Sequence, residues 1–175
     1  ANSGEKLWNF YTIPGPGEFG HDTWPQDSDV WQYGGAPIWN TPAVDPELDM
    51  IYFTTGNAYP SFNGGARPGD NLFTASIVAL DATTGEYRWH YQAVPEDSWD
   101  FDNTQQLVTA DLVINGEERH VVMQAPKNGV FYVIDIATGE VLSADLYVPS
   151  ANWMLGFDEN FKPLINPEAN YGAFG

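Results

Sequence analysis

Two stretches of the sequence, ALDATTGEYRWHY at Ala79–Tyr91 and VIDIATGEVLSA at Val133–Ala144, follow the same plan. Each has a β-rich run, an aspartate, two or three further residues, Thr-Gly-Glu and then a second β-rich run. Aspartate and Thr-Gly favour a tight turn with the glycine in the left-handed conformation, so each copy predicts two strands joined at this turn. The repeat is therefore the main clue to how the chain is organised.

A third copy, SGEKLWNFY at Ser3–Tyr11, is the same unit without its first strand. Its glycine is followed four residues later by a tryptophan, which we expect to pack against a neighbouring unit. The pairs are Gly4 with Trp8 and Gly85 with Trp89, whereas Gly139 is followed by Ser143. Because the sequence begins inside a repeat, it also suggests a processed or truncated chain.

Short runs of strand-forming residues recur between Gly, Pro, Asn and Asp, and strong helix patterns are missing. The predicted strands are Met50–Thr55, Ser76–Leu80, Glu86–Tyr91, Leu107–Leu112, His120–Gln124 and Gly129–Asp135. The dipeptide Asn115-Gly116 is a strong signal for a β-hairpin. The sequence thus predicts an all-β fold with long loops, in a single domain over residues 1–175.

Composition excludes several classes of function. The 175 residues include 24 acidic and 6 basic ones, a formal net charge of −18 that disfavours nucleic acid and anionic lipid and favours metal cations. There is no cysteine, which excludes disulfides, thiolate metal sites and covalently attached c-type haem within the chain. No run approaches the length of a membrane span, and neither zinc-ligand spacing nor a nucleotide-binding glycine motif is present.

The Asp-x-x-Thr-Gly-x-x-x-x-Trp unit resembles the tryptophan-docking motif of the alcohol dehydrogenases that depend on pyrroloquinoline quinone (PQQ). Other segments similar to this family cover nearly the whole chain: Pro14–Pro25, Gly34–Trp39, Asp45–Asn57, Arg67–Asp81 and Ala125–Asp135. The resemblance implies an eight-bladed β-propeller, of which this chain is a central fragment of about three blades. It also implies that the remaining blades or a second chain complete the fold, and that the fragment is inactive alone.

The same resemblance implies a periplasmic enzyme that oxidises a primary alcohol by hydride transfer to PQQ beside a bound metal ion, and passes electrons to a cytochrome c. The stretch SWDFDNTQ at Ser98–Gln105 is central to this expectation. On its own, Asp100 reads as a cap or a solvated turn residue. The resemblance makes it the catalytic base and a metal ligand, because a carboxylate beside a Lewis-acidic metal can take the proton of the alcohol.

Asp102 bears on the identity of the metal. Two positions after Asp100, it faces away in an extended loop, but both carboxylates can reach one ion in a bent loop. Family members that use lanthanides carry aspartate here, and those that use calcium carry a small neutral residue, so the resemblance favours a lanthanide(III) ion over Ca²⁺. A trivalent ion is stabilised by an added anionic ligand. The alternative is that Asp102 is a solvated acid pointing to water.

Three further residues acquire roles through the resemblance. Asn57, otherwise a turn residue, becomes a metal ligand through its amide oxygen, although the glutamate that the family supplies from an earlier blade has no counterpart here. Trp39, otherwise a core residue, becomes the flat floor beneath PQQ. Lys127, otherwise part of a surface turn with Asn128 and Gly129, becomes the donor to the quinone oxygens.

One departure from the family concerns Pro37. Many members carry a threonine at this position that binds the cofactor, and proline has no side-chain donor. The rival interpretation of the whole chain is a non-catalytic propeller that keeps the repeat as a scaffold for protein binding. A scaffold does not need Trp39, Asn57, Asp100 and Lys127 together, and this set therefore favours the enzyme.

Overall fold

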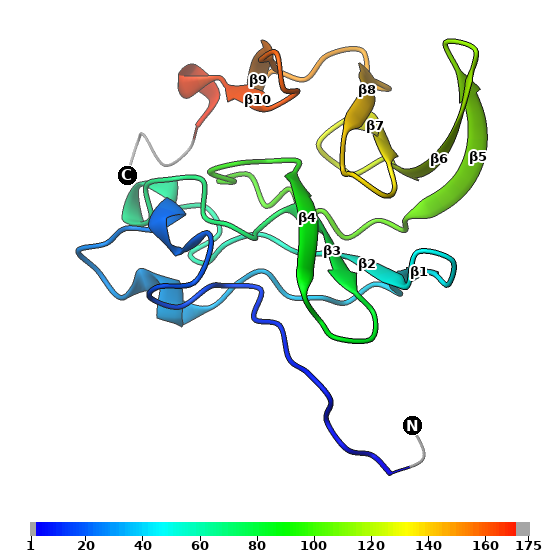
Figure 1. The fold of residues 1–175 in the computed structure, drawn as a ribbon. Coiled ribbons are helices and arrows are strands. Elements are labelled where there is room, and N and C mark those ends of the chain that lie inside the picture. The colour runs from blue at the N-terminus through cyan, green and yellow to red at the C-terminus, as the bar shows by residue number, and fades with distance from the viewer. Residues whose placement is uncertain (1–2, 171–175) are drawn as a thin grey trace.

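The protein is described here by a computed structural model that covers residues 3–170 and is built from antiparallel sheets (Figure 1). The first sheet contains β1 (Ala43–Asp45), β2 (Met50–Thr54), β3 (Ser76–Asp81) and β4 (Tyr87–Gln92). The second sheet contains β5 (Val108–Ile114), β6 (Glu117–Gln124), β7 (Val130–Asp135) and β8 (Val141–Leu146). A two-stranded sheet pairs β9 (Met154–Phe157) with β10 (Pro163–Ile165).

In the first and second sheets every strand pairs with the strands next to it in the sequence. The helical segments of the described residues are short 3-10 turns, namely η1 (His21–Thr23), η2 (Val30–Tyr33), η3 (Gly64–Ala66) and η4 (Pro167–Ala169). The prediction of an all-β fold with long loops is therefore confirmed. None of the helices between residues 3 and 170 has the length and apolar character that a membrane span requires.

The predicted strands correspond to β2 through β7, with ends displaced by no more than three residues. Asn115 and Gly116 form the predicted hairpin turn between β5 and β6, and both have left-handed backbones, with φ of 53° and 87°. Strands β1, β9 and β10 were not predicted. They are only three or four residues long, too short for an alternating pattern to stand out.

The repeated turn is built in the same way in both complete copies. The Asp81 carboxylate accepts hydrogen bonds from the Thr84 backbone N–H at 2.7 Å and the Thr84 hydroxyl at 2.8 Å, and the Gly85 N–H donates to the Asp81 carbonyl at 2.9 Å. Gly85 has φ of 75°, the left-handed conformation that the sequence predicted. The second copy repeats these contacts with Asp135, Thr138 and Gly139.

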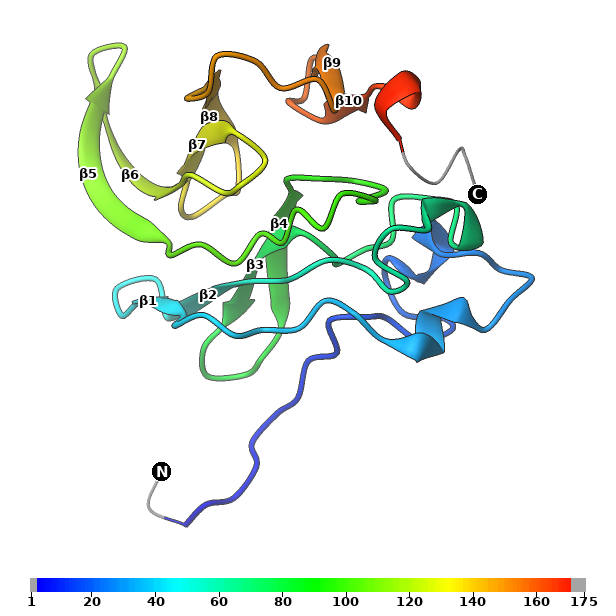
Figure 2. The same ribbon diagram turned by 180° about the vertical axis from the view of Figure 1, so that it is seen from behind.

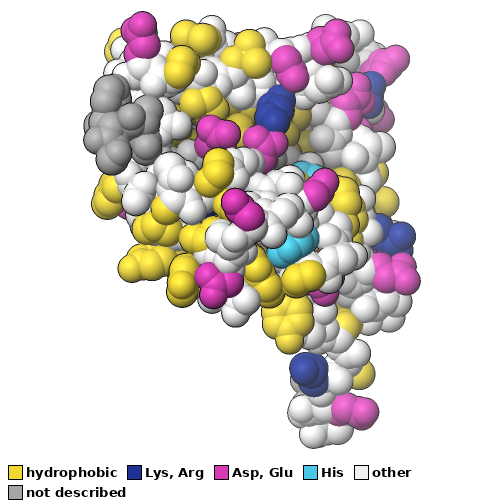
Figure 3. All heavy atoms as spheres, turned by 90° about the vertical axis from the view of Figure 1, so that its left-hand side faces the viewer, with side chains coloured by type: hydrophobic (Ala, Val, Ile, Leu, Met, Phe, Trp, Pro, Cys, Tyr) yellow, Lys and Arg dark blue, Asp and Glu magenta, His cyan; other side chains and the backbone are white. Residues whose placement is uncertain are grey.

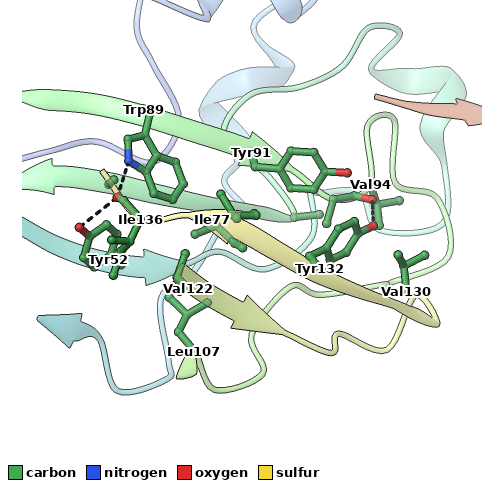
Figure 4. Packing of buried hydrophobic residues seen from close by; sticks show 14 of the residues in the cluster. Tyr52, Ile77, Trp89, Tyr91, Val94, Leu107, Val122, Val130, Tyr132 and Ile136 are labelled. Carbon is green, nitrogen blue, oxygen red and sulfur yellow. Dashed lines mark hydrogen bonds between the residues drawn. The ribbon is translucent and has the colours of Figure 1, made fainter. Parts of the chain in front are cut away.

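In two of the three units a tryptophan covers the glycine of the next unit. The Trp89 ring lies on Gly139 so closely that a Cβ there would be 2.7 Å from Trp89 Cδ2. The Trp89 indole N–H donates to the Ile136 carbonyl at 3.1 Å (Figure 4). Trp8 lies on Gly85 in the same manner. The expectation that these tryptophans pack against neighbouring units is confirmed.

The main hydrophobic core lies between the first and second sheets (Figure 4). It combines side chains from β2, β3 and β4 with side chains from β6 and β7. The Tyr52 hydroxyl donates to the Ile136 carbonyl at 3.2 Å, and the rings of Tyr91 and Tyr132 lie 5.0 Å apart between their centroids. The two sheets are therefore held in a fixed relation, which places the loops after β2, β4 and β6 near one another.

The long loops around η1, η2 and η3 lie together beside the first sheet in both ribbon views (Figures 1 and 2). On the side of the molecule seen in Figure 3, hydrophobic side chains gather between scattered acidic ones. Exposed aromatic side chains on these loops include Phe19, Tyr33, Tyr59 and Phe62. Such a concentration of exposed apolar groups is typical of a surface that contacts further protein.

Candidate active site and metal centre

The loop between β4 and β5 is bent around a buried carboxylate. Asp97 is fully buried and accepts hydrogen bonds from the backbone N–H groups of Trp99 and Phe101, each at 2.9 Å. Asp100, between them, has a left-handed backbone with φ of 63°. Aspartate tolerates this conformation better than most residues. The bend decides between the two expected loop shapes, because it lets Asp100 and Asp102 approach the same point.

The Lys127 ammonium lies between the carboxylates of Asp100 and Asp102. Its Nζ lies 3.6 Å from Asp100 Oδ2 and 3.1 Å from Asp102 Oδ2. The Asp100 side chain is 40% exposed, whereas that of Asp102 is 9% exposed, so Asp102 is not a solvated acid. Burial lowers the pKa of Lys127, but the hydrogen bond and charge of Asp102, together with Asp100, outweigh this and raise the pKa above its usual value.

Asn57, just after β2, joins the same cluster. Its backbone N–H donates to Asp102 Oδ1 at 2.9 Å. Its side-chain amide donates to the Ala58 carbonyl at 2.9 Å and to the Ser61 hydroxyl at 2.6 Å, which fixes the orientation of the amide plane. No donor among residues 3–170 reaches Asn57 Oδ1. This oxygen is therefore available to a cation.

Gly56 makes the close approach of Asp102 possible. A Cβ at this position would lie 2.8 Å from Asp102 Oδ1 and 2.9 Å from Pro37 Cδ. The sequence did not single out Gly56 as a site residue, because the requirement comes from a segment far along the chain. Its only local signal is its place in the run Thr54–Asn57 at a strand end.

Trp39 lies on the neighbouring segment. The Ala36 N–H donates to the Asn57 carbonyl at 2.8 Å, and the Gly56 N–H donates to the Pro37 carbonyl at 2.9 Å. Trp39 follows this paired segment and is 60% exposed. The structure thus brings Asn57, Asp100, Asp102 and Lys127 together through direct contacts. No hydrogen bond or ring contact within the described residues joins Trp39 to these four.

The turn that carries Lys127 is held in place by hydrogen bonds of the neighbouring Asn128 side chain. The Asn128 side-chain amide donates to the Ala93 carbonyl at 3.2 Å and to the Tyr132 hydroxyl at 2.8 Å, while its Oδ1 accepts from the Val130 N–H at 3.0 Å. Gly129 has φ of 91°, and a Cβ there would lie within 2.6 Å of a Val148 methyl. Lys127 therefore projects from a rigid turn, as the Lys-Asn-Gly sequence suggested.

The oxygen atoms gathered at this site are suitable ligands for a hard cation, but they do not complete its coordination shell. Two carboxylates and one amide oxygen are the ligands that ions of the size of calcium prefer, and the ammonium of Lys127 shows that positive charge is stabilised between the carboxylates. Residues 3–170 hold no group of three or more His, Cys, Asp or Glu arranged to bind a metal. The residues present therefore fit a metal ion whose other ligands come from outside these contacts.

The buried Asp97 carboxyl is expected to make the free energy of unfolding depend on pH. Burial raises the pKa of Asp97 to about 6, against the effects of the Trp99 and Phe101 amides and of Arg67. Because this pKa exceeds that of the unfolded chain, the carboxyl stabilises the fold most at low pH, and that contribution is lost as the pH rises through about 6. Between pH 4 and 7, the stability advantage of wild type over Asp97→Asn is expected to shrink by up to about 3 kcal/mol.

The check is denaturant unfolding of both proteins at several pH values. Comparing the two proteins at each pH removes the contribution of the other acidic groups, which both proteins share. A difference in unfolding free energy that stays constant from pH 4 to pH 7 would show that Asp97 is not held in a raised-pKa state.

With the geometry established, comparison with known proteins identifies the family. The family model described as PQQ, glucose/ethanol/alcohol dehydrogenase, β-propeller domain, matches residues 1–145. The chain belongs to this family. The predicted family membership and the β-propeller architecture are thus confirmed, and the first and second sheets are two blades of the propeller.

Curated relatives in the PQQ dehydrogenase family support this assignment. The chain is 46% identical over 181 residues to the quinohemoprotein alcohol dehydrogenase ADH-IIG of Pseudomonas putida, covering 96% of this chain and 25% of that protein. It is 41% identical over 185 residues to the quinohemoprotein alcohol dehydrogenase of Comamonas testosteroni, covering 99% of this chain and 26% of that protein. The chain therefore spans about a quarter of the length of these relatives.

Solved structures agree with the PQQ dehydrogenase fold. The structure of ADHIIG from Pseudomonas putida HK5 matches with a TM-score of 0.85 and 44% identity, over 94% of this chain and 26% of that one. A structure described as a europium-containing methanol dehydrogenase matches with a TM-score of 0.79 and 35% identity, over 90% of this chain and 27% of that one. Both similarities extend to sequence as well as fold.

Proposed function

We propose that the chain forms the catalytic and metal-binding part of a periplasmic PQQ-dependent dehydrogenase that oxidises primary alcohols. The observation that carries this proposal is the convergence of Asn57, Asp100, Asp102 and Lys127 on one point, from three loops of a chain in this family. Curated relatives bear the name alcohol dehydrogenase, which supports the class of substrate. A scaffold propeller would have no use for these four side chains in contact.

In this proposal each site residue has a defined chemical role, and Asp100 has two, as base and as metal ligand. When bound, PQQ supplies the hydride acceptor and the metal ion supplies a Lewis acid. Asp100, the more exposed carboxylate, accepts the proton of the alcohol hydroxyl. Lys127 places a positive charge where negative charge develops on the quinone oxygens. Trp39 offers an exposed flat face for the cofactor ring to stack on.

The metal is proposed to be held by Asn57 Oδ1 and by the carboxylates of Asp100 and Asp102, with a lanthanide(III) favoured over Ca²⁺. Asp102 is buried, and its Oδ2 lies 3.1 Å from the Lys127 ammonium, so this carboxylate already stabilises a positive charge at the site. The second carboxylate charge, from Asp102, adds most to the binding of a trivalent ion. A related structure is described as a europium-containing methanol dehydrogenase, which supports this preference.

The surface of the molecule indicates two kinds of protein partner. The exposed aromatic side chains of the loops around η1 to η3 are proposed to contact the remaining propeller blades or a second chain. The net charge of −18 suits the docking of a basic cytochrome c that accepts the electrons. No role for nucleic acid is proposed.

The experiment that tests the function is reconstitution of the intact apo protein with PQQ and either La³⁺ or Ca²⁺. Wild type is expected to oxidise alcohol, measured by dye reduction, with a preference for La³⁺. Asp102→Asn removes one ligand charge yet keeps an oxygen for the Asn57 N–H, so we expect it to reduce La³⁺-dependent activity at least tenfold, about 1.4 kcal/mol, more than Ca²⁺-dependent activity.

The matched control is Asp111→Asn, an acid on β5 whose side chain is 86% exposed. Full wild-type activity with Ca²⁺, together with La³⁺-dependent activity that is unchanged in Asp102→Asn, would leave the enzyme proposal standing and remove the lanthanide preference. Absence of both PQQ binding and activity with either metal would instead favour the scaffold interpretation.

A further inference from the structure

Arg67 is a fully buried arginine that lies outside the proposed metal and cofactor site. It follows η3, on the loop between β2 and β3. Few basic residues are present in the chain, six in all, and most of them are on the surface, where they pair with acids. A charged side chain that has been withdrawn from water in so acidic a protein calls for a specific reason.

The guanidinium bonds to three separate segments. Its Nε donates to the Pro60 carbonyl at 3.2 Å, one Nη donates to the Ser61 carbonyl at 3.2 Å, and the other Nη donates to Asn71 Oδ1 at 2.8 Å. The Nη that contacts Ser61 also donates to the Asp97 carbonyl. Four of the five N–H donors of the guanidinium are therefore used, all by neutral oxygens.

Arg67 is not the partner of a buried ion pair. Among the described residues, no carboxylate lies within ion-pair distance of its guanidinium, although the charges of Asp97 and Glu96 act on it at longer range. Burial lowers the pKa of Arg67 from its usual value. Withdrawing a cation from water costs free energy, and its hydrogen bonds to carbonyl and amide oxygens mainly offset that cost. What the buried cation does provide is a rigid connection between the loops that these oxygens belong to.

Each of those loops orients a proposed metal ligand. The Ser61 carbonyl accepts a hydrogen bond from Arg67, and the Ser61 hydroxyl accepts one from the Asn57 side-chain amide at 2.6 Å, which fixes the orientation of that amide. Asp97, whose carbonyl binds Arg67, holds the two amides that flank Asp100. Arg67 thus touches neither ligand, but it contacts the residue that orients each of them.

We propose that Arg67 is a positioning residue that locks the Asn57 loop to the Asp100 loop, so that the metal ligands are held together before the metal arrives. This inference rests on the proposed function of the same site. Preorganisation lowers the conformational entropy lost on binding, and its removal is expected to weaken metal binding without removing a ligand. The effect should fall on both Ca²⁺ and La³⁺, because Arg67 does not select the ion.

The test uses the intact apo protein as wild type, Arg67→Lys and Arg67→Met, with Arg88→Met as the control. Arg88 on β4 is 46% exposed and pairs with Asp81 at the outer turn. Lysine keeps the positive charge but cannot donate hydrogen bonds to three segments at once. Methionine keeps a long side chain but has neither the charge nor the donors. Titration with La³⁺ or Ca²⁺ is expected to show at least tenfold weaker binding in both Arg67 variants and less than a twofold change in Arg88→Met.

Amide hydrogen exchange on the metal-free proteins supplies a readout that is independent of activity. Both Arg67 variants are expected to exchange faster in residues 57–63 and 97–102, with β5 to β8 unchanged. In wild type, La³⁺ is expected to slow exchange in residues 64–71, which contain no proposed ligand but carry Arg67. This last measurement needs no variant, and it decides the proposal if both Arg67 variants fail to fold.

The possible outcomes distinguish a failure of the proposed role of Arg67 from a failure of the proposed function of the site. If wild type binds metal and Asp100→Asn weakens that binding while folded Arg67 variants bind like wild type, Arg67 is a structural residue and the inference fails alone. Faster exchange spread evenly over the chain would lead to the same conclusion, as would an absence of La³⁺-induced protection in residues 64–71. If wild type binds neither metal, both proposals fail together.

Discussion

Asp100→Asn in the intact protein is expected to slow alcohol oxidation by about 10²–10⁴-fold, the usual contribution of a positioned general base. Asparagine has nearly the same shape and cannot take up the proton of the alcohol. It also tolerates the left-handed backbone of this position, where φ is 63°. The loop around Asp97 should therefore keep its form, and the loss should arise from the missing carboxylate rather than from misfolding.

The measurement is kcat and kcat/KM with PQQ and metal at saturation, because Asp100 is also a proposed ligand. Metal titration of the same variant separates a loss of binding from a loss of chemistry. Asp111→Asn, on the exposed outer strand, serves again as the control for added amide and lost charge. Wild-type turnover by a variant that holds both PQQ and metal would exclude Asp100 as the base.

Gly139→Ala is expected to destabilise the protein by about 3 kcal/mol or more, the combined effect of a left-handed alanine and an overpacked contact. The glycine has φ of 79°, and a Cβ would lie 2.7 Å from Trp89 Cδ2. The tryptophan ring cannot yield without losing its hydrogen bond to the Ile136 carbonyl and its place between the sheets. The change therefore acts on the junction of two blades.

Gly116→Ala provides the matched control. Gly116 also has a left-handed backbone, with φ of 87°, but nothing lies within 4 Å of where its Cβ would be. Its substitution should cost about 1–2 kcal/mol from the backbone alone. Denaturant unfolding of the two variants isolates the contribution of the tryptophan contact as their difference. Equal destabilisation by both would show that Trp89 does not depend on a bare glycine.

Local features of the fold could be predicted from the sequence. The repeated turns at Asp81 and Asp135 are made by hydrogen bonds within a few residues, so their sequence alone specifies them. The Asn115-Gly116 hairpin is equally local. Short strands such as β9 are stabilised by contacts with residues far away in the sequence, and no short-range pattern predicts them.

The candidate site was predictable only as a set of residues, through the family resemblance. That Asp102 reaches the Asn57 N–H, 45 positions away, depends on how the loop after β4 returns to the end of β2, which no spacing reveals. Gly56 and Arg67 were missed for the same reason. Their importance lies in what approaches them from other loops, namely the Asp102 carboxylate for Gly56 and the Asp97 carbonyl for Arg67.

The packing of each tryptophan on the glycine of the following unit gives the propeller a direction. The stability of such an array is the sum of the stabilities of its units and of the junctions between neighbours, as in a one-dimensional chain of coupled units. Trp8 and Trp89 couple their units to the next one, but the second sheet carries Ser143 in the equivalent place. The unit that ends in β8 therefore lacks the tryptophan contact of the other two, and the segment that follows it is joined to the main core by different packing, that of Trp153 and Met154.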